Sequence, residues 1–212
     1  MEEKEISQAV VARLPRYLRY LGELRDEGIE RVSSQELSDI MRVTASQIRQ
    51  DLNTFGGFGQ QGYGYNVGHL YNEIGKILGL NREYQLIIVG AGHLGQALVN
   101  YSNFERRGFL FRGIFDHDPK VCGKKIRGIT VRPMEEMAGF IRDNDIDIAV
   151  LTIPKTSAME VAEQLAACGI RGIWNFAHVD LRLPGHIQVE NVHLSDSLMK
   201  LSYNLSSAEE ET

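Results

Sequence analysis

The chain has 212 residues, of which 43% are hydrophobic and 24% are charged, and its formal net charge is −5. This composition is ordinary for a folded globular protein and excludes a disordered or collagen-like chain. Its apolar runs fall short of the ~20 residues of a membrane helix, and its acidic start differs from the basic start of a secretory signal, so we expect a cytoplasmic protein.

The spacing of apolar residues changes near residue 80. Before this point the spacing is helical, and from Tyr84 onward short apolar strands alternate with amphipathic helices. Gly79 stands at the end of a helical stretch and suits a left-handed C-cap. We therefore expect two domains and a terminal helix, with the boundaries 1–80, 84–192 and 193–206.

The first predicted helix runs from about Gln8 to Glu27 and shows arginines between its apolar positions. Pro15 lies inside this helix and lacks an amide proton, so it should kink the helix or start a new segment. An acidic chain can approach DNA only through a local basic face. Arg13 belongs to the basic face that we expect here.

Two short helices follow, each preceded by a capping-box pattern. Ser33 and Thr44 each stand three residues before a Glu or Gln, which predicts helices at Ser34–Met41 and Ala45–Phe55. The two-residue link between them forces a sharp corner, as in a helix-turn-helix. The residues expected to be buried are Leu37 and Ile40 in the first helix and Ile48 and Leu52 in the second.

The second of these helices is the expected reader of DNA, because its N-terminal residues meet base edges in a helix-turn-helix. Arginine pairs with guanine and glutamine with adenine. For Arg49 a solvated surface charge is the alternative. The glycine-rich segment 56–65 predicts a β-hairpin wing, with a flexible loop as its alternative. The expected DNA-contacting residues are Arg13, Ser46, Gln47, Arg49, Gln50, Gly59 and Tyr63.

A buried strand leads into a glycine-rich turn in the second half. The apolar run 86–89 is typical of a parallel strand buried on both faces, and it precedes GAGHLG and an amphipathic helix. In this context Gly90 makes a tight turn, Gly92 admits a pyrophosphate and Gly95 lets helix and strand pack closely. A similar fold that binds nothing is the alternative. The predicted pyrophosphate loop consists of Gly90, Ala91, Gly92, His93, Leu94 and Gly95.

The next predicted strand, Phe111–Phe115, ends in Asp116, 21 residues beyond Gly95. A carboxylate there accepts hydrogen bonds from ribose hydroxyls and repels a 2′-phosphate, which favours NAD(H) over NADP(H). Asp118 is the competitor, but it precedes a proline in a turn. Helices are further expected at 133–142, 157–167 and 195–205, and strands at 146–153, 172–176 and 186–192. Two strand ends add Thr152, Ile153, Pro154, Asn175 and Phe176 to the cofactor site.

The two rival interpretations of the sequence are an NAD-dependent dehydrogenase and a repressor whose effector is CoA. Cys122 and Cys168 lie far apart with no histidine cluster, so neither zinc nor another metal nor a disulfide is expected. A dehydrogenase needs a substrate domain and an acid or base beside the nicotinamide. Few residues follow the last predicted strand, and neither His178 nor His186 has an evident orienting partner, so no catalysis is expected. A CoA-binding domain uses a similar turn, but Asp116 weighs against CoA.

The segments RLPRYLRYL, SSQELSDIM, VTASQIRQDLNTFGGFGQQGYGY, IIVGAGHLG and WNFAHVDL resemble the Rex family of bacterial redox-sensing transcriptional repressors over almost the whole chain. The resemblance implies a winged helix-turn-helix joined to a Rossmann-like parallel-sheet domain. It implies a homodimer that binds an inverted-repeat operator when NAD+ is bound or the site is empty, and that releases it when NADH rises. It also implies that the C-terminal helix is exchanged between protomers.

The resemblance also carries roles for single residues. Arg16 corresponds to a helix arginine engaged at the domain interface, and Tyr101 to a tyrosine that helps sense the nicotinamide. The family often has an acidic residue followed by phenylalanine at the start of the exchanged helix, where this chain has His193 and Leu194. A histidine there could make DNA release depend on pH, with a plain surface imidazole as the alternative.

Overall fold

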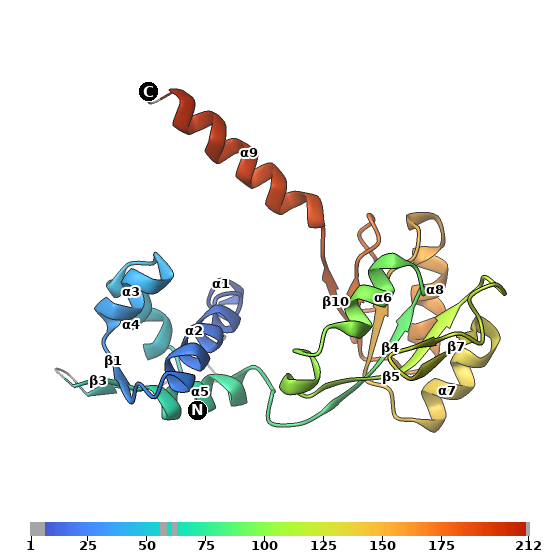
Figure 1. The fold of residues 1–212 in the computed structure, drawn as a ribbon, viewed down its shortest axis with the longest axis horizontal. Coiled ribbons are helices and arrows are strands. Elements are labelled where there is room, and N and C mark those ends of the chain that lie inside the picture. The colour runs from blue at the N-terminus through green and yellow to red at the C-terminus, as the bar shows by residue number, and fades with distance from the viewer. Residues whose placement is uncertain (1–6, 56–58, 61–62, 211–212) are drawn as a thin grey trace. The chain divides into compact units, whose positions relative to one another are not determined.

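The computed structural model describes residues 7–55, 59–60 and 63–210, and the backbone alone for residues 59–60 and 208–210 (Figure 1). Residues 56–58 and 61–62 of the expected wing lie outside the described residues. The chain divides into two compact units, Met1–Arg82 and Glu83–Thr212. Each unit is described by itself below.

The first unit begins with two helices where the sequence analysis expected one. Helix α1 spans Gln8–Val11, and α2 spans Leu14–Asp26. Pro15 lies in the first turn of α2, where its missing amide proton removes no helical hydrogen bond, so the chain breaks just before it. The expected effect of this proline on the helix is confirmed. The buried residues of α2 are Leu14, Tyr17, Leu18, Leu21 and Leu24.

The helix-turn-helix consists of α3 (Ser34–Met41) and α4 (Ala45–Asn53). The corner between them is made at Arg42, which adopts left-handed backbone angles with φ 53°. Leu37 is buried as expected, but Ile40 is 39% exposed and Met41 takes the second core position, so the assignment of Ile40 was wrong. Residues four apart share a helix face, which places Met41 above Leu37.

A small antiparallel sheet and a last helix complete the first unit. Strands β1 (Arg31–Val32), β2 (Gly59–Gln60) and β3 (Gly64–Asn66) pair in the order β1-β3-β2, and β2 with β3 forms a hairpin where the wing was expected. Helix α5 spans Val67–Ile77, Leu78 is its C-cap residue, and Gly79 follows with φ 72°. The left-handed glycine predicted from the sequence is therefore present.

The second unit is a seven-stranded sheet in the order β10-β9-β8-β4-β5-β7-β6. Counted along the chain, its six parallel strands take the order 3-2-1-4-5-6 of dinucleotide-binding folds, with the order reversing between β4 and β8. The strands are β4 (Tyr84–Val89), β5 (Phe109–Asp116), β6 (Lys125–Ile126), β7 (Ile129–Pro133), β8 (Ile148–Leu151), β9 (Gly172–Asn175) and β10 (Gln188–Asn191).

Strand β7 is absent from the sequence-based expectation, which began a helix at Pro133. In the structure Pro133 is the last residue of β7, and a 3-10 turn, η2 (Met134–Glu136), precedes the helix α7 (Met137–Asp143). The strand is short, with one fully buried residue at its centre, Val131. Such a pattern is too brief to be distinguished from a loop by apolar spacing alone.

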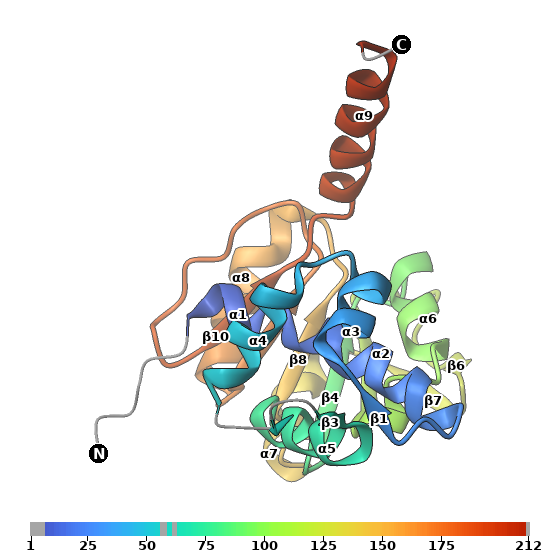
Figure 2. The same cartoon turned by 90° about the vertical axis from the view of Figure 1, so that its left-hand side faces the viewer.

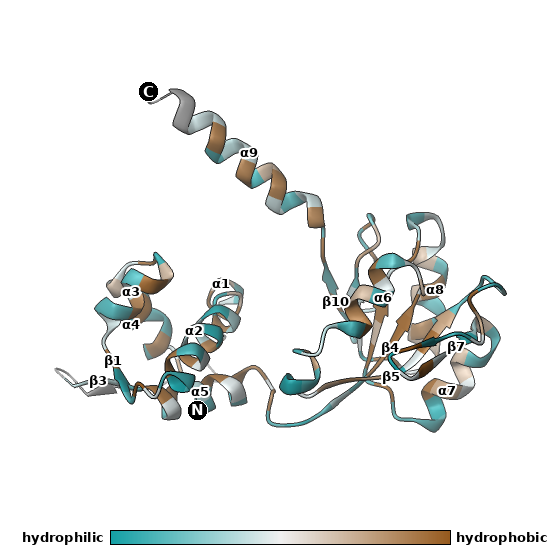
Figure 3. Ribbon diagram, in the orientation of Figure 1, coloured by the Kyte–Doolittle hydropathy of each residue, from teal (hydrophilic) through white to brown (hydrophobic). Residues whose placement is uncertain are grey.

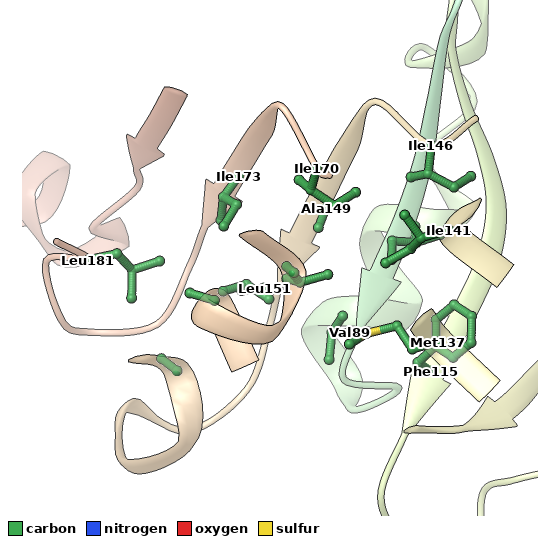
Figure 4. Packing of buried hydrophobic residues seen from close by; sticks show 14 of the residues in the cluster. Val89, Phe115, Met137, Ile141, Ile146, Ala149, Leu151, Ile170, Ile173 and Leu181 are labelled. Carbon is green, nitrogen blue, oxygen red and sulfur yellow. The ribbon is translucent and has the colours of Figure 1, made fainter. Parts of the chain in front are cut away.

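The remaining helices cover the sheet and build a core on each of its faces. Helix α6 (His93–Asn100) follows β4, η1 (Glu105–Arg107) precedes β5, and α8 (Lys155–Ala167) follows β8. Side chains of α7 and α8 pack against one face, where Val89, Phe115 and Leu151 meet Met137 and Ile141 (Figure 4). The opposite face carries its own cluster, which includes Leu86, Ile88, Val99 and Val150.

Helix α9 (Leu194–Glu210) stands clear of the sheet in both views (Figures 1 and 2). Its apolar positions recur along the helix (Figure 3), and its large apolar side chains are 52–70% exposed. Leu194, Leu198, Leu201 and Leu205 follow one another at spacings of four, three and four residues and so share one face of the helix. An exposed apolar face of this kind is typical of an interaction surface. Among the described residues, no helix is long and apolar enough to cross a membrane. The exposed apolar residues of α9 are Leu194, Leu198, Met199, Leu201, Tyr203 and Leu205.

Candidate functional site

The two helices of the helix-turn-helix start differently. At α3 the capping box is complete, because the Glu36 amide donates to Ser33 Oγ (3.1 Å) and the Ser33 amide donates to Glu36 Oε2 (2.6 Å). These hydrogen bonds lower the pKa of Glu36. At α4 only half of the box forms: the Gln47 amide donates to Thr44 Oγ1 (3.2 Å), whereas the Gln47 side chain donates to Asp51 Oδ1 (2.8 Å). The second predicted capping box is therefore corrected to a simple N-cap.

Three of the expected reading residues lie on one exposed face of α4. Ser46, Arg49 and Gln50 are exposed, and the Arg49 guanidinium donates to Ser34 Oγ at the start of α3 (2.9 Å). This hydrogen bond places a cation where α3 and α4 come together. The face therefore exposes two polar side chains and one arginine, which are residue types that can pair with base edges.

Arg13 and Gln47, also expected to contact DNA, both donate hydrogen bonds to Asp51. The Arg13 Nε and Nη2 atoms donate to the two Asp51 carboxylate oxygens, each at 2.7 Å, and the Tyr17 hydroxyl donates to Oδ2 at 3.0 Å. The Asp51 side chain is 0% exposed. Sequence reasoning missed Asp51, although its position beside Ile48 and Leu52 on the apolar face of α4 was a signal.

The hairpin adds one exposed aromatic residue and one unforeseen cation. Tyr63 is 69% exposed. Arg31, on β1, donates from Nη1 to the Tyr63 carbonyl (3.0 Å), and its guanidinium carbon lies 6.0 Å from the centre of the Tyr63 ring. Gly59 lies in β2. Arg31 could have been found from its place at the strand that pairs with the hairpin.

Arg16, the expected interface residue, has partners inside the first unit. Its guanidinium donates to the Met41 carbonyl at the end of α3. Its guanidinium carbon also lies 5.9 Å from the centre of the Tyr20 ring. The side chain therefore stabilises the corner of the helix-turn-helix through the last carbonyl of α3.

The glycines of the loop between β4 and α6 serve different steric needs. Gly90 has φ 104°, and a Cβ there would lie 2.6 Å from the Thr152 carbonyl oxygen. A Cβ on Gly95 would lie 2.0 Å from the Gly90 carbonyl oxygen. A Cβ on Gly92, the exposed N-cap of α6, would meet nothing within 4 Å. Gly90 and Gly95 are thus required by the fold, while Gly92 keeps the helix start open to a ligand.

Asp116 lies beside this loop at the end of β5. Its Oδ2 accepts from the Ala91 amide (2.6 Å), its Oδ1 accepts from the Asp118 amide (2.8 Å), and the side chain is 11% exposed. Asp118 instead accepts from the Lys120 amide within a turn. Oδ1 also lies 3.4 Å from His117 Nδ1, whereas Oδ2 has a second lone pair that can accept from a ribose hydroxyl. The loop, the open helix start and this carboxylate together fit a dinucleotide.

The strand ends contribute less through side chains than expected. Thr152 Oγ1 donates to the Gly90 carbonyl (2.8 Å), so it supports the loop. The Asn175 side chain is buried, donates to the Val179 carbonyl and the Asn191 amide oxygen, and accepts from the Ala177 amide. The Asn175 side chain is thus held by three hydrogen bonds within the second unit. The neighbouring positions Ile153, Pro154 and Phe176 are partly or fully exposed.

Tyr101 and His193 each have polar neighbours within the second unit. Tyr101, at the end of α6, is 53% exposed, and its hydroxyl accepts from the Asn103 amide (2.9 Å). His193 Nε2 lies 3.4 Å from Asp180 Oδ1, and its ring stacks on that of His178 with 6.2 Å between centroids. Both cysteines are free thiols, and no metal-binding cluster of His, Cys, Asp and Glu occurs in the described part of the chain.

Two family models match the chain. Residues 5–53 match "Putative DNA-binding protein N-terminus", and residues 81–179 match "CoA binding domain". Among curated proteins, the redox-sensing transcriptional repressor Rex of Clostridium perfringens strain SM101 is 55% identical over 97% of this chain and 98% of its own length. The redox-sensing transcriptional repressor Rex of Clostridioides difficile strain 630 is 57% identical over 94% of this chain and 95% of its own length.

Solved structures show the same likeness. A crystal structure of RSP in complex with beta-NAD+ and operator DNA is 55% identical, with a TM-score of 0.91 over 98% of this chain and 95% of that one. A crystal structure of RSP in complex with beta-NADH is 52% identical, with a TM-score of 0.90 over 98% of this chain and 97% of that one. RSP is described as a Rex-family repressor.

Proposed function

The chain belongs to the Rex family of redox-sensing transcriptional repressors, and we propose that it represses transcription by binding operator DNA and releases that DNA when NADH binds. The observation that carries this function is the presence, in one chain, of a DNA-reading helix and a dinucleotide loop in the same fold as RSP, which binds operator DNA, NAD+ and NADH. A repressor acts in the cytoplasm of a bacterium, so we place this protein there.

The dinucleotide site is proposed to consist of backbone donors and one carboxylate. The loop 90–95 and the start of α6 supply amide groups and partial positive charge for the pyrophosphate. Asp116 would accept from the ribose hydroxyls and repel a 2′-phosphate. The nicotinamide end would reach the ends of β8 and β9, near Ile153, Pro154 and Phe176, with Tyr101 as its sensor. NAD(H) supplies no reaction here and acts as a ligand.

The DNA site is proposed to consist of the exposed face of α4 and the hairpin. Ser46, Arg49 and Gln50 would meet base edges, while Gly59 and Tyr63 would meet the DNA backbone. A homodimer with twofold symmetry places two such helices on an inverted repeat. The domain boundaries proposed for this arrangement are 1–80 for DNA, 84–192 for NAD(H) and 193–206 for the exchanged helix.

The exchange of α9 is proposed from its exposed apolar row, which a second protomer would cover. His193 stands at the base of this helix and would contact the domain interface together with Arg16. Truncation before Ser195 should lower dimer stability, which sedimentation would measure. In the truncated protein, NADH binding should no longer cause the release of operator DNA. A truncated protein that stays dimeric and responsive to NADH would place both functions elsewhere.

A dehydrogenase is the rival, since Rossmann folds occur widely in oxidoreductases. The curated relatives over the whole chain are named as repressors. His178 and His186 are exposed, and the ring neighbour of His178 is another histidine. Hydride transfer between NAD(H) and any member of a panel of small alcohols and acids would restore the enzyme interpretation.

The match to a CoA-binding model makes CoA the specific alternative effector. Calorimetry with NADH, NAD+, NADPH and CoA separates the effectors. We expect NADH to bind more tightly than NADPH, because of Asp116, and more tightly than CoA. Tight binding of CoA without binding of NADH would replace the proposed effector while leaving the DNA site in place.

The coupling between the two sites is tested by thermodynamic linkage. If NADH weakens operator binding, the operator must weaken NADH binding by the same factor, with typical couplings of roughly 1–3 kcal/mol, about 5–150-fold. We would titrate NADH with and without saturating operator DNA, follow nicotinamide fluorescence, and repeat the pair by calorimetry with NAD+. Equal dissociation constants for NADH in the two titrations would show that the sites are not coupled.

A further inference from the structure

We propose that Asp51 is the positioning residue of the DNA-reading helix α4. Its buried carboxylate fixes the orientation of α4 on α2, so that Arg13 and Gln47 orient the helix while the exposed residues of α4 meet the bases. This inference rests on the proposed function, because it concerns how the chain reads its operator. It changes the role of two residues that the sequence assigned to DNA contact.

The carboxylate of Asp51 is saturated by donors from two helices. Arg13 is the N-cap residue of α2, Tyr17 lies within α2, and Gln47 comes from the first turn of α4. Together they donate four hydrogen bonds of 2.7–3.0 Å. A carboxylate offers about four lone-pair positions, so no acceptor position of Asp51 is left for water or DNA. The hydrogen bonds to Asp51 likewise engage two of the Arg13 nitrogen atoms and the Gln47 side-chain amide nitrogen.

Charge holds this network together. Burial by itself would raise the pKa of Asp51, but the hydrogen bonds from Arg13, Gln47 and Tyr17 outweigh burial and lower the pKa below its ordinary value. The pKa of Arg13 is raised by its hydrogen bond to Asp51, so the guanidinium stays charged. Burial and the negative charge of Asp51 raise the pKa of Tyr17, so its hydroxyl stays a neutral donor. At neutral pH Asp51 is therefore an ionised acceptor, while Arg13 and Tyr17 are protonated donors.

The network restrains a motion that apolar packing leaves open. Ile48 and Leu52 bury α4 in the core, and such contacts depend on area rather than on direction. The paired hydrogen bonds between Arg13 and Asp51 fix both carboxylate oxygens in the plane of the guanidinium. Gln47 stands one turn before Asp51 on the same side of α4 and adds a fourth restraint. Rotation of α4 about its own axis would break these hydrogen bonds.

The reading of bases depends on this restraint, because the side chains of a binding site must stay within about 0.5 Å and 10–20° of the geometry in which they bind. A rotated α4 would keep its charge and its general attraction for DNA while misaligning Arg49 and Gln50 with the bases. Loss of the network should therefore reduce discrimination between operator and scrambled DNA more than it reduces binding to DNA of any sequence.

The first test is Arg13→Lys, measured on operator and on scrambled duplex over a range of salt concentrations. Lysine keeps the charge but cannot form the paired hydrogen bonds. We expect the ratio of the two affinities to fall by about tenfold or more, with the salt dependence unchanged. If Arg13 contacts a phosphate instead, Arg13→Lys keeps the ratio, and Arg13→Ala lowers the salt slope by roughly 0.9. That result would overturn the proposal.

The second test separates orientation from stability. The triple variant Arg13→Met, Tyr17→Phe, Asp51→Leu replaces the network by apolar contacts, a change that buried ion pairs often tolerate without loss of stability. We expect it to melt near the wild-type temperature and to lose operator discrimination. Wild-type discrimination in this variant would overturn the proposal. If the triple variant does not fold, Arg13→Lys decides alone.

The outcomes also distinguish this inference from the proposed function. A wild-type chain that shows no preference for any operator would contradict the proposed function. A wild-type chain that prefers its operator, together with variants that prefer it equally well, would contradict only the role of Asp51. Arg19→Lys serves as the matched control, because Arg19 is an exposed arginine of the same helix α2 and is not one of the donors to Asp51.

Discussion

The DNA-reading helix and the dinucleotide loop each depend on an aspartate, but the two carboxylates differ in what they bind. Asp51 is fully buried and receives hydrogen bonds from side chains of two helices. Asp116 keeps 11% of its side chain exposed, receives hydrogen bonds from two backbone amides and lies 3.4 Å from His117 Nδ1. The first carboxylate is closed off by its partners, whereas the second remains open to a ligand.

This difference shows two ways to hold a binding surface. In the first unit, side chains distant in the sequence set the orientation of a helix, and the surface that binds lies on its other face. In the second unit, the path of the backbone makes the surface, and glycines decide that path. Substitutions of glycine should therefore damage the second site most, and substitutions of polar side chains should damage the first.

The largest effect is expected for Gly95→Ala. Its Cβ would lie 2.0 Å from the Gly90 carbonyl oxygen, so the loop or α6 must shift. We expect a loss of about 3 kcal/mol or more in the unfolding free energy of the second unit, with loss of NADH binding. Fluorescence of Trp174, the single tryptophan, reports unfolding of this unit.

Gly92→Ala is the matched control for Gly95→Ala, because both variants add one methyl group to the same loop. Its Cβ would meet nothing within 4 Å, so stability should stay close to wild type. NADH binding should still weaken, because the added methyl group stands at the open start of α6. Equal stability losses in Gly92→Ala and Gly95→Ala would contradict the steric roles assigned here.

A smaller effect is expected for Asp116→Ala, which removes the acceptor for the ribose hydroxyls and the repulsion of a 2′-phosphate. A charge-assisted hydrogen bond contributes about 1.5–3 kcal/mol, so NADH binding should weaken roughly 10–150-fold and the preference over NADPH should narrow. Asp116→Asn separates charge from hydrogen bonding, and Asp118→Ala is the control. Wild-type protein that binds NADPH as tightly as NADH would refute the assignment.

Arg49→Ala should weaken operator binding by about 1–3 kcal/mol while NADH affinity stays unchanged, because Arg49 lies on the exposed face of α4 in the other unit. Gel-shift titration measures the first quantity and calorimetry the second. Arg49→Lys keeps the charge and should lose sequence preference before it loses overall affinity. Unchanged operator affinity in Arg49→Ala would remove this residue from the reading surface.

The smallest effect is expected from acid. Because the pKa of Asp51 is lowered in the folded chain, its contribution to stability is present above the unfolded value near pH 3.9 and is lost as pH falls through the folded pKa. The protection of α4 amides from hydrogen exchange, measured relative to the intrinsic exchange rate at each pH, should therefore fall below about pH 4. Asp51→Asn should flatten this dependence, and an unchanged dependence in that variant would assign the acid response to other carboxylates.

Several features of the chain were predictable because short stretches of sequence encode them. The bounds of α3 agree with the prediction, since Ser33 and Glu36 form a capping box within four residues. The turn from β4 to α6 was predictable because glycine alone fits the close approaches at Gly90 and Gly95. Pro15 and Gly79 marked helix boundaries for equally local reasons.

Other features were decided only by the tertiary structure. Arg13 reads as a surface cation until α2 and α4 pack together and bring it to Asp51, 38 residues away. Asn175 reads as a polar strand end until its neighbours enclose both ends of its amide. Strand β7 and the exposure of Ile40 likewise depend on neighbouring elements. Caps, turns and glycine sterics act between residues adjacent in sequence, whereas the partner of a long polar side chain is chosen by whichever distant group packing brings within hydrogen-bond reach.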